Sequence, residues 1–224
     1  MKSIKFAIVF AVAFFIFAPS AANAQVIEVL KRMDAHYKAL KTLKSGISRE
    51  VFNSQLKETD TYSGDLVLVP GKGTKLSVLL KWTKPKEEVL SVVNGKYALY
   101  VPGIKRAYTG TSGDKRVKEK GGSALELMNL SKQEIKSKYE AVQLGTASVG
   151  GTDTVGLRLT PKAKAEYKFI DVWVDGNGMP IQIKVTKNNN DTDTIRFSGI
   201  KKNENINGSV FKIDIPKGTE VVKG

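Results

Sequence analysis

Residues 62–108 decide the fold, and their sequence is YSGDLVLVPGKGTKLSVLLKWTKPKEEVLSVVNGKYALYVPGIKRAY. Hydrophobic side chains recur at every second position of the first two segments, and Asp65, Lys75, Ser77 and Lys81 point the other way. This period of two is typical of a strand with one buried face and one solvated face. Asn94-Gly95 adds a strong hairpin signal, because both residues readily adopt positive φ. The stretch therefore predicts a β-meander whose buried face carries Leu66, Leu68, Leu76, Val78, Leu80 and Trp82.

The first 24 residues have the composition of a secretory signal peptide. Two lysines precede an unbroken apolar run at residues 6–18, and Ala22-Asn23-Ala24 is a small-x-small cleavage site. The run is too short for an ordinary membrane span, although an uncleaved anchor is the alternative. We expect cleavage after Ala24, which leaves residues 25–224 as a single exported domain.

Composition narrows the class of partner. The chain has no cysteine, so neither a thiol nucleophile nor a thiol-metal site can be built. Without Lys2 and Lys5 it holds 34 basic and 22 acidic residues, a formal charge of +12. This excess favours an anionic membrane surface as a partner, although it also serves solubility. We expect no nucleic-acid partner, because the lysines are scattered and no aromatic-basic stacking motif is present.

An N-terminal helix is predicted over residues 26–43. Hydrophobic residues from Val26 to Leu40 recur at steps of three and four and form one stripe. We expect this stripe to cover the concave face of the sheet. His36, the single histidine, lies beside the stripe, and no nucleophile motif accompanies it, so we interpret it as a structural residue.

Two short helices are predicted between the halves of the sheet. Residues 110–122 are rich in glycine and lysine and indicate a loop, after which residues 124–130 form a short apolar helix. Ser131 and Glu134 have the spacing of a capping box, which starts a second helix that ends near Tyr139. The pair could be a hinged flap over the sheet or a fixed plug of its core. Both interpretations stay open.

From Tyr139 onward the pattern is again that of short strands. Ile181, Ile183 and Val185 alternate with polar residues, and so do Phe211, Ile213 and Ile215. The count reaches ten or eleven strands joined by tight turns, with no alternation of strands and helices. The fold class is therefore mainly β: one large antiparallel sheet, strongly curved or closed, with helices on its concave side.

No constellation of catalytic or metal-binding residues emerges. Ser54 with Lys57, and Ser112 with Lys115, match a serine–lysine spacing at the level of chance. The acidic residues near Asp175 precede a glycine turn, for which hairpin formation is the simpler explanation. Paired carboxylates for glycoside chemistry stay open, because spacing along the chain does not reveal spacing in space. We expect a binding protein without enzymatic activity, metal or cofactor.

Several motifs together resemble the LolA family of periplasmic lipoprotein carriers. They are Gly64-Asp65-Leu66, Trp82-Thr83-Lys84-Pro85, Asn94-Gly95-Lys96, Leu99-Tyr100-Val101-Pro102, residues 157–162 and residues 211–221. The resemblance implies an incomplete antiparallel β-barrel, a helical lid and an apolar cavity for acyl chains. The family's lid is held by an arginine before the proline that follows the first motif. Here Val69 precedes Pro70, so the chain departs from that pattern.

The leading hypothesis is a periplasmic carrier that shuttles acylated lipoproteins or other lipids between the inner and outer membranes. The resemblance implies an inner-membrane release complex and an outer-membrane acceptor as partners, and we expect a monomer. A sensor of envelope lipids without transfer activity is the alternative, and an acyl-ester hydrolase ranks third. The predicted lipid-binding residues are Leu66, Leu68, Leu76, Val78, Leu80, Trp82, Ile181, Ile183 and Val185 on the sheet, with Leu127, Met128 and Leu130 on the lid.

Overall fold

The computed structural model describes residues 21–71, 76–122 and 130–224. Within these ranges, every helix is too short or too polar to cross a membrane. The elements are α1 Ala21–Ala39, β1 Leu43–Asn53, β2 Glu58–Val69, β3 Ser77–Lys84, β4 Glu88–Val93, β5 Lys96–Val101, η1 Pro102–Ile104, β6 Arg106–Thr111, α2 Lys115–Val117, η2 Lys118–Gly122, α4 Lys132–Lys138, β7 Tyr139–Val149, β8 Thr152–Pro161, β9 Tyr167–Asp175, β10 Pro180–Lys187, β11 Thr192–Lys202, η3 Gly208–Phe211 and β12 Glu220–Lys223.

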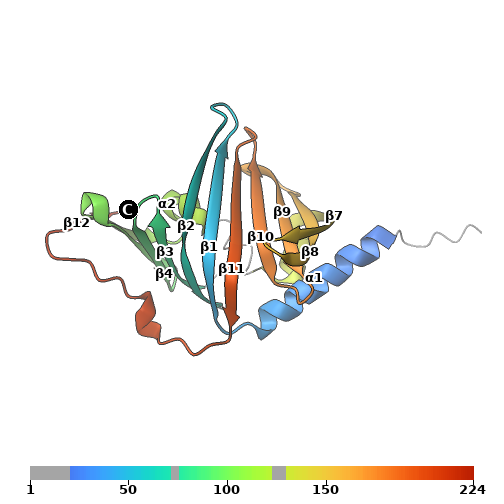
Figure 1. The fold of residues 1–224 in the computed structure, drawn as a ribbon, viewed down its shortest axis with the longest axis horizontal. Helices are drawn as coiled ribbons and strands as arrows, with labels where there is room; N and C mark the ends of the chain where they lie inside the picture. The colour runs from blue at the N-terminus through green and yellow to red at the C-terminus, as the bar shows by residue number, and fades with distance from the viewer. Residues whose placement is uncertain (1–20, 72–75, 123–129) are drawn as a thin grey trace, which may run out of the picture.

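The twelve strands described form one curved sheet that does not close. Its order is β12-β6-β5-β4-β3-β2-β1-β11-β10-β9-β8-β7, so β12 and β7 are the two edges (Figure 1). Neighbouring strands are antiparallel except β12, which runs parallel to β6. The predicted mainly-β class and incomplete barrel are confirmed. The predicted purely antiparallel sheet needs the correction of this one parallel pair.

The meander over β2–β6 forms as its alternation predicts. Leu66 pairs with Leu80, and Leu80 pairs with Leu90 on the next strand, so these leucines share one face of the sheet. Asn94 and Gly95 both have positive φ, 51° and 75°, and connect β4 to β5. The hairpin predicted at this dipeptide is confirmed.

The N-terminal helix ends four residues earlier than predicted. Asn203, which follows β11, accepts a hydrogen bond from the backbone N–H of Lys41 at 2.7 Å and donates one to the carbonyl of Ala39 at 3.2 Å. These bonds take the place of further helical turns. Leu43, predicted as the last helical residue, is therefore the first residue of β1.

The region predicted as a loop at residues 110–122 is partly regular. β6 extends to Thr111, and α2 and η2 then turn the chain across the sheet. The capping box of the next helix is confirmed: the hydroxyl of Ser131 accepts the N–H of Glu134, and the Glu134 carboxylate accepts the N–H of Ser131. The apolar helix predicted at residues 124–130 lies outside the described residues except for Leu130.

The strand predicted from the alternation of Phe211, Ile213 and Ile215 is wrong. Residues 203–219, which we call the strap, contain the short 3-10 helix η3 and a turn at residues 217–218, and they form no strand pairing. The strap packs against the face of β3 and β4 opposite the main core. There the side chain of Phe211 is buried, and the hydroxyl of Ser91 donates to the Phe211 carbonyl. At Phe211, a hydrogen bond from a side chain thus takes the place of backbone pairing with a neighbouring strand.

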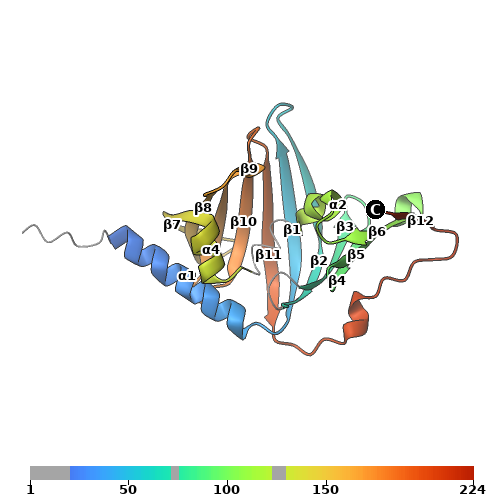
Figure 2. The ribbon, with the colours of Figure 1, turned by 180° about the vertical axis from the view of Figure 1, so that it is seen from behind.

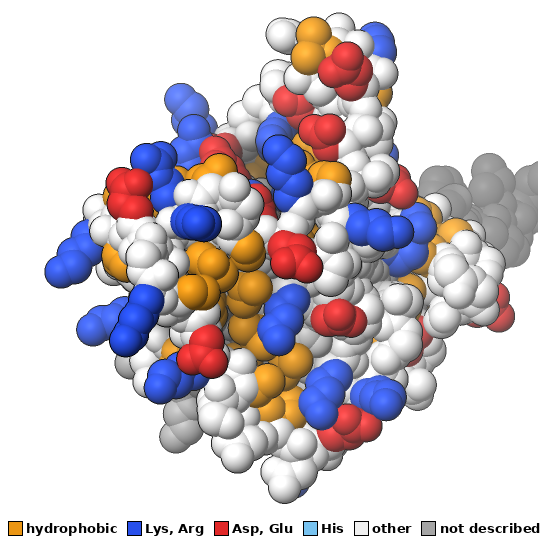
Figure 3. Space-filling model, turned by 60° about the vertical axis from the view of Figure 1, so that its left-hand side comes forward, with side chains coloured by type: hydrophobic (Ala, Val, Ile, Leu, Met, Phe, Trp, Pro, Cys, Tyr) orange, Lys and Arg blue, Asp and Glu red, His pale blue; other side chains and the backbone are white. Residues whose placement is uncertain are grey.

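Hydrophobic side chains are unevenly distributed over the surface. On the side of the molecule that carries β3–β6 and β12, they gather in a continuous streak bordered by charged side chains of both signs (Figure 3). On the opposite, inner face of the sheet lie the helical segments α2 and α4 (Figure 2). The helices thus cover the inner face, while the strap covers part of the outer one.

Candidate functional site

The predicted site residues come together on the inner face of the sheet. Leu66, Leu68, Val78, Leu80, Trp82, Ile181, Ile183 and Val185 are all buried in one hydrophobic cluster. Leu76 and Leu130 are partly buried and pack against it. Leu127 and Met128 lie outside the described residues. The two halves of the sheet therefore share one apolar interior, and the lipid-binding role of these residues stays a prediction.

Sequence reasoning missed the contribution of the central and C-terminal strands to this interior. The cluster also contains side chains from β1, β8, β9 and β11, among them Leu43, Ile47, Leu157, Leu159, Val172, Ile195 and Phe197. The same alternation marks them in the sequence, so the signal was present. Since none of these side chains is more than 3% exposed, the interior is closed in this conformation.

Helix α1 closes one end of this interior. Its stripe is confirmed, because Val29 and Leu30 are each only 2% exposed. The β9–β10 turn approaches the helix so closely that a Cβ on Gly178 would lie 2.2 Å from the carbonyl oxygen of Arg32. The Arg32 guanidinium in turn donates to the carbonyl of Gly176 at 3.1 Å. The helix is thus seated on a turn that requires glycine.

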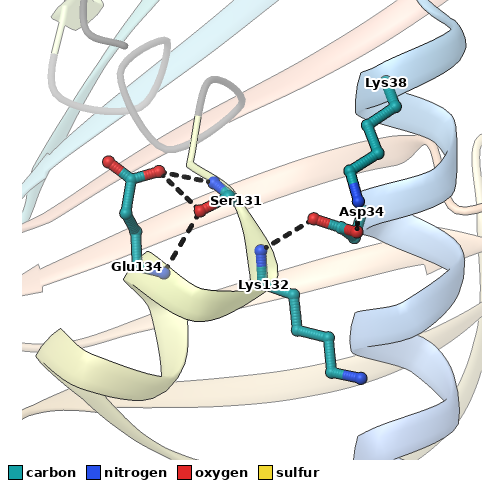
Figure 4. Close-up of polar contacts among 5 residues, drawn as sticks. All are labelled: Asp34, Lys38, Ser131, Lys132 and Glu134. Atoms are coloured by element: carbon teal, nitrogen blue, oxygen red, sulfur yellow. Dashed lines mark hydrogen bonds and ion pairs between the residues drawn. The ribbon is translucent and has the colours of Figure 1, made fainter.

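A second contact, which we call the latch, joins α1 to α4 (Figure 4). The Asp34 carboxylate accepts the backbone N–H of Lys132, at the start of α4, over 3.1 Å. Lys38 lies 2.7 Å from the same carboxylate. The hydrogen bond from Lys38, followed by that from Lys132, holds the pKa of Asp34 below its ordinary value. A carboxylate at a helix N-terminus is favourable because the unpaired N–H groups there carry partial positive charge.

A third contact ties α1 to the end of β2. The hydroxyl of Tyr37 donates to the carbonyl of Gly71 at 3.2 Å, and burial raises the pKa of this phenol. Gly71 lies two residues after Val69, the position at which the family resemblance implies an arginine. In this chain, Tyr37 and Asp34 therefore supply polar anchors for α1.

A cavity of about 640 Å³, lined by many charged residues, opens where β1, β2, β9, β10 and β11 face the α2–η2 segment. It is lined by Arg49, Val51, Tyr62, Gly113, Lys115, Lys118, Glu119, Lys120, Glu166, Tyr167, Val185, Lys187 and Asp193. Val185 belongs both to this lining and to the hydrophobic cluster. The cavity thus borders the apolar interior at Val185. Sequence reasoning missed it, because no motif marks residues that come from five strands and the segments between them.

Residues weighed as metal ligands, Asp171 and Asp175, and as a catalytic serine, Ser54, have structural partners. Asp175 accepts the N–H groups of Asn177 and Met179, each at 2.8 Å, which confirms the hairpin interpretation. Asp171 forms a two-pronged ion pair with Arg158 at 2.7 and 2.8 Å. The hydroxyl of Ser54 donates to the Asn189 carbonyl at 2.7 Å. These groups brace the sheet and its turns.

The Nε2 atom of His36 has no such partner, since it is buried without a hydrogen bond from any described residue. Burial, followed by the charge of Lys202, lowers the pKa of His36. Among the described residues, no group of three or more histidine, aspartate or glutamate side chains is arranged to hold a metal ion.

Comparisons with known proteins agree with this architecture. The family model of the outer membrane lipoprotein carrier protein LolA matches residues 39–214. No curated protein matches the sequence.

Solved structures share the fold at low sequence identity. An uncharacterized conserved protein from Thermus thermophilus is 10% identical, with a TM-score of 0.57 over 90% of this chain and 99% of that one. MucB is 12% identical, with a TM-score of 0.58 over 85% of this chain and 63% of MucB. MucB in the Pseudomonas aeruginosa MucA/MucB complex gives a TM-score of 0.50 at 12% identity, over 85% and 61%.

Proposed function

Because the chain belongs to the family of the outer membrane lipoprotein carrier protein LolA, we propose that it is a periplasmic carrier of acylated molecules. It binds the acyl chains of lipoproteins or other lipids against the inner face of the sheet and shuttles them between the inner and outer membranes. An inner-membrane release complex and an outer-membrane acceptor are its partners. It acts by binding, without catalysis or a cofactor.

One observation carries this proposal: the inner faces of both halves of the sheet form a single aliphatic surface, with Leu80 and Ile183 each 0% exposed. Each methylene kept from water is worth about 0.8 kcal/mol, so exposing a chain of roughly sixteen carbons costs on the order of 10 kcal/mol. A carrier must supply an apolar surface of that extent. The inner face of the sheet supports such a role.

The interior is closed in this conformation, so loading requires the helices to move. The polar contacts of α1 at Asp34, Tyr37 and Arg32 are few and lie at its border with solvent. Such contacts contribute about 1 kcal/mol each. Helix α1 and the inserted region, with the predicted residues Leu127, Met128 and Leu130, then act as the lid, and a guest acyl chain lies against the inner face of the sheet at Leu66, Val78 and Ile181.

Acyl cargo tests the proposal directly. The protein, purified from a membrane-containing host without detergent, should carry lipid or lipoprotein in native mass spectrometry, and a fluorescent acyl probe should bind the delipidated protein. A polar substitution on the inner face, Val185→Asn, should weaken probe binding. The matched variant Thr186→Asn, on the neighbouring residue whose side chain points to the other face, should not. Repeated absence of cargo together with absence of probe binding overturns the proposal.

A sensor that binds lipid and then a protein partner is the second candidate. The solved structures with this fold include MucB in complex with MucA, which motivates it. A transfer assay separates the two roles: a carrier moves acylated protein from donor to acceptor vesicles. A sensor binds the same cargo without moving it and associates with an envelope protein only when lipid is present.

A further inference from the structure

We propose that the cavity at Arg49 is a head-group site for an acyl amphiphile that carries a phosphate. Arg49 donates hydrogen bonds to the phosphate oxygens, and Lys118 and Lys187 supply positive charge at the rim. This inference rests on the proposed function, because the acyl chain of the same molecule lies in the adjoining apolar interior.

Arg49 is a fixed donor in the wall of this cavity. It is only 7% exposed, and the Asp193 carboxylate accepts hydrogen bonds from its Nε and Nη2 atoms at 2.8 and 2.7 Å. The guanidinium lies over the ring of Tyr62, with 5.5 Å from its central carbon to the ring centroid. A guanidinium carries five N–H groups, and the pair with Asp193 uses two of them. This orientation therefore leaves donors for a ligand in the cavity.

The balance of charge around the cavity favours an anion. Asp193 is paired with Arg49, Glu119 lies 3.5 Å from Lys115, and Lys120 pairs with Glu88 from β4. Of the remaining lining charges, Lys118, Lys187 and Glu166 form no ion pair within the described chain. Two exposed lysines therefore face one exposed glutamate at the rim, beside a guanidinium whose donors are only partly used.

The α2–η2 segment that carries Lys118 is held firmly over the inner face (Figure 2). The Asp114 carboxylate caps it by accepting the N–H of Arg116 at 2.8 Å, and Val117 is buried. Gly121 has φ of 100°, and a Cβ there would lie 2.9 Å from the Cδ1 atom of Ile195. The rim of the cavity at Lys118 is thus positioned by the packing of the α2–η2 segment on the sheet.

The cavity suits an amphiphile better than a wholly polar ligand. Its volume of about 640 Å³ falls within the range of small-molecule sites. Val51 and Val185 line it together with the charged groups, and Val185 leads into the hydrophobic cluster. A phosphate between Arg49 and the rim lysines therefore leaves its acyl chain directed at the aliphatic interior.

Ligands that share one acyl chain test this inference by titration calorimetry at low salt. The probes are 1-palmitoyl lysophosphatidic acid, 1-palmitoyl glycerol, which lacks the phosphate, and inorganic phosphate alone. A hydrogen bond to a charged group is worth about 1.5–3 kcal/mol, so the phosphate-bearing lipid should bind about tenfold or more tightly than palmitoyl glycerol. Inorganic phosphate alone should bind much more weakly than the lipid.

Variants assign the preference to named groups. Lys118→Gln with Lys187→Gln should remove most of the preference for the phosphate head. Lys212→Gln with Lys217→Gln makes the same charge change on the exposed strap and should leave the preference intact. Arg49→Lys keeps the charge but loses the second hydrogen bond to Asp193, and it should also reduce the preference for the phosphate-bearing lipid. Its thermal unfolding is followed in parallel to exclude misfolding.

The failures are distinguishable. Equal binding of the two palmitoyl lipids overturns the head-group site while the carrier proposal stands. Absence of binding by every acylated probe overturns the carrier proposal itself. Binding of inorganic phosphate as tightly as the lipid overturns the lipid assignment, because the cavity would then be a site for the free anion.

Discussion

Replacing Gly178 by alanine tests how α1 is seated on the sheet. Gly178 has φ of 85°, a conformation that disfavours any side chain. The new Cβ would lie 2.2 Å from the Arg32 carbonyl oxygen and 2.8 Å from the Met33 nitrogen. Both atoms belong to the helix backbone and cannot rotate aside, so α1 must shift.

The expected cost combines two terms. The left-handed conformation costs about 1–2 kcal/mol for an ordinary residue, and forcing an extra methyl group into packed structure costs about 1–3 kcal/mol. A total of roughly 3 kcal/mol corresponds to a fall in the melting temperature of about 6–12 °C for a domain of this size. Thermal unfolding followed by circular dichroism measures it.

Gly176→Ala is the matched control, because it lies in the same turn and an added Cβ there meets nothing within 4 Å. It should change the melting temperature little. If Gly178→Ala and Gly176→Ala have the same melting temperature, α1 does not pack on the β9–β10 turn as described. If α1 is also part of the lid, Gly178→Ala should in addition raise the affinity for an acyl probe, because less packing has to be broken to load it.

Three further predictions address the latch and the strap. Asp34→Ala should weaken the α1–α4 contact by about 1 kcal/mol and speed amide hydrogen exchange in α4. Glu28→Ala removes a carboxylate from the exposed side of the same helix and should leave the exchange rates in α4 unchanged. Equal exchange rates in the two variants would contradict the latch. Because the pKa of Asp34 is lowered in the folded state, its stabilising contribution is present above the ordinary aspartate pKa and is lost as the pH falls through the lowered value. The difference in melting temperature between wild type and Asp34→Ala should therefore shrink in acid. A difference that stays constant with pH would refute the assignment. Phe211→Ala should destabilise the protein by about 3 kcal/mol and make the strap susceptible to limited proteolysis. Ile215→Ala, on the exposed part of the strap, should not. Equal protease resistance in the two variants would show that Phe211 does not anchor the strap.

The sequence predicted best where the signal is local. The meander follows from its alternation and from Asn94-Gly95, whose positive φ is a property of the dipeptide itself. The capping box at Ser131 is likewise complete within four residues. The inner-face position of Leu66 and Ile183 follows from period two in each strand, and both lie in the same cluster.

The errors occur where a distant residue decides the local structure. The end of α1 depends on Asn203, 164 positions after the Ala39 carbonyl that it contacts. Phe211 is drawn out of a strand by Ser91, 120 positions earlier. The Arg49–Asp193 pair joins residues 144 positions apart. No local period or motif reports such contacts, so the cavity was absent from the predicted site.

The parallel pairing of β12 with β6 also affects how the chain is assembled. Glu220 lies opposite Arg106, and their side chains form an ion pair at 2.8 Å across 114 positions of sequence. Contacts of such long separation form late, since a large loop has to close first. A partly synthesised chain therefore presents β6 as an uncovered edge, open to pairing with other chains, until residues 220–223 have been made.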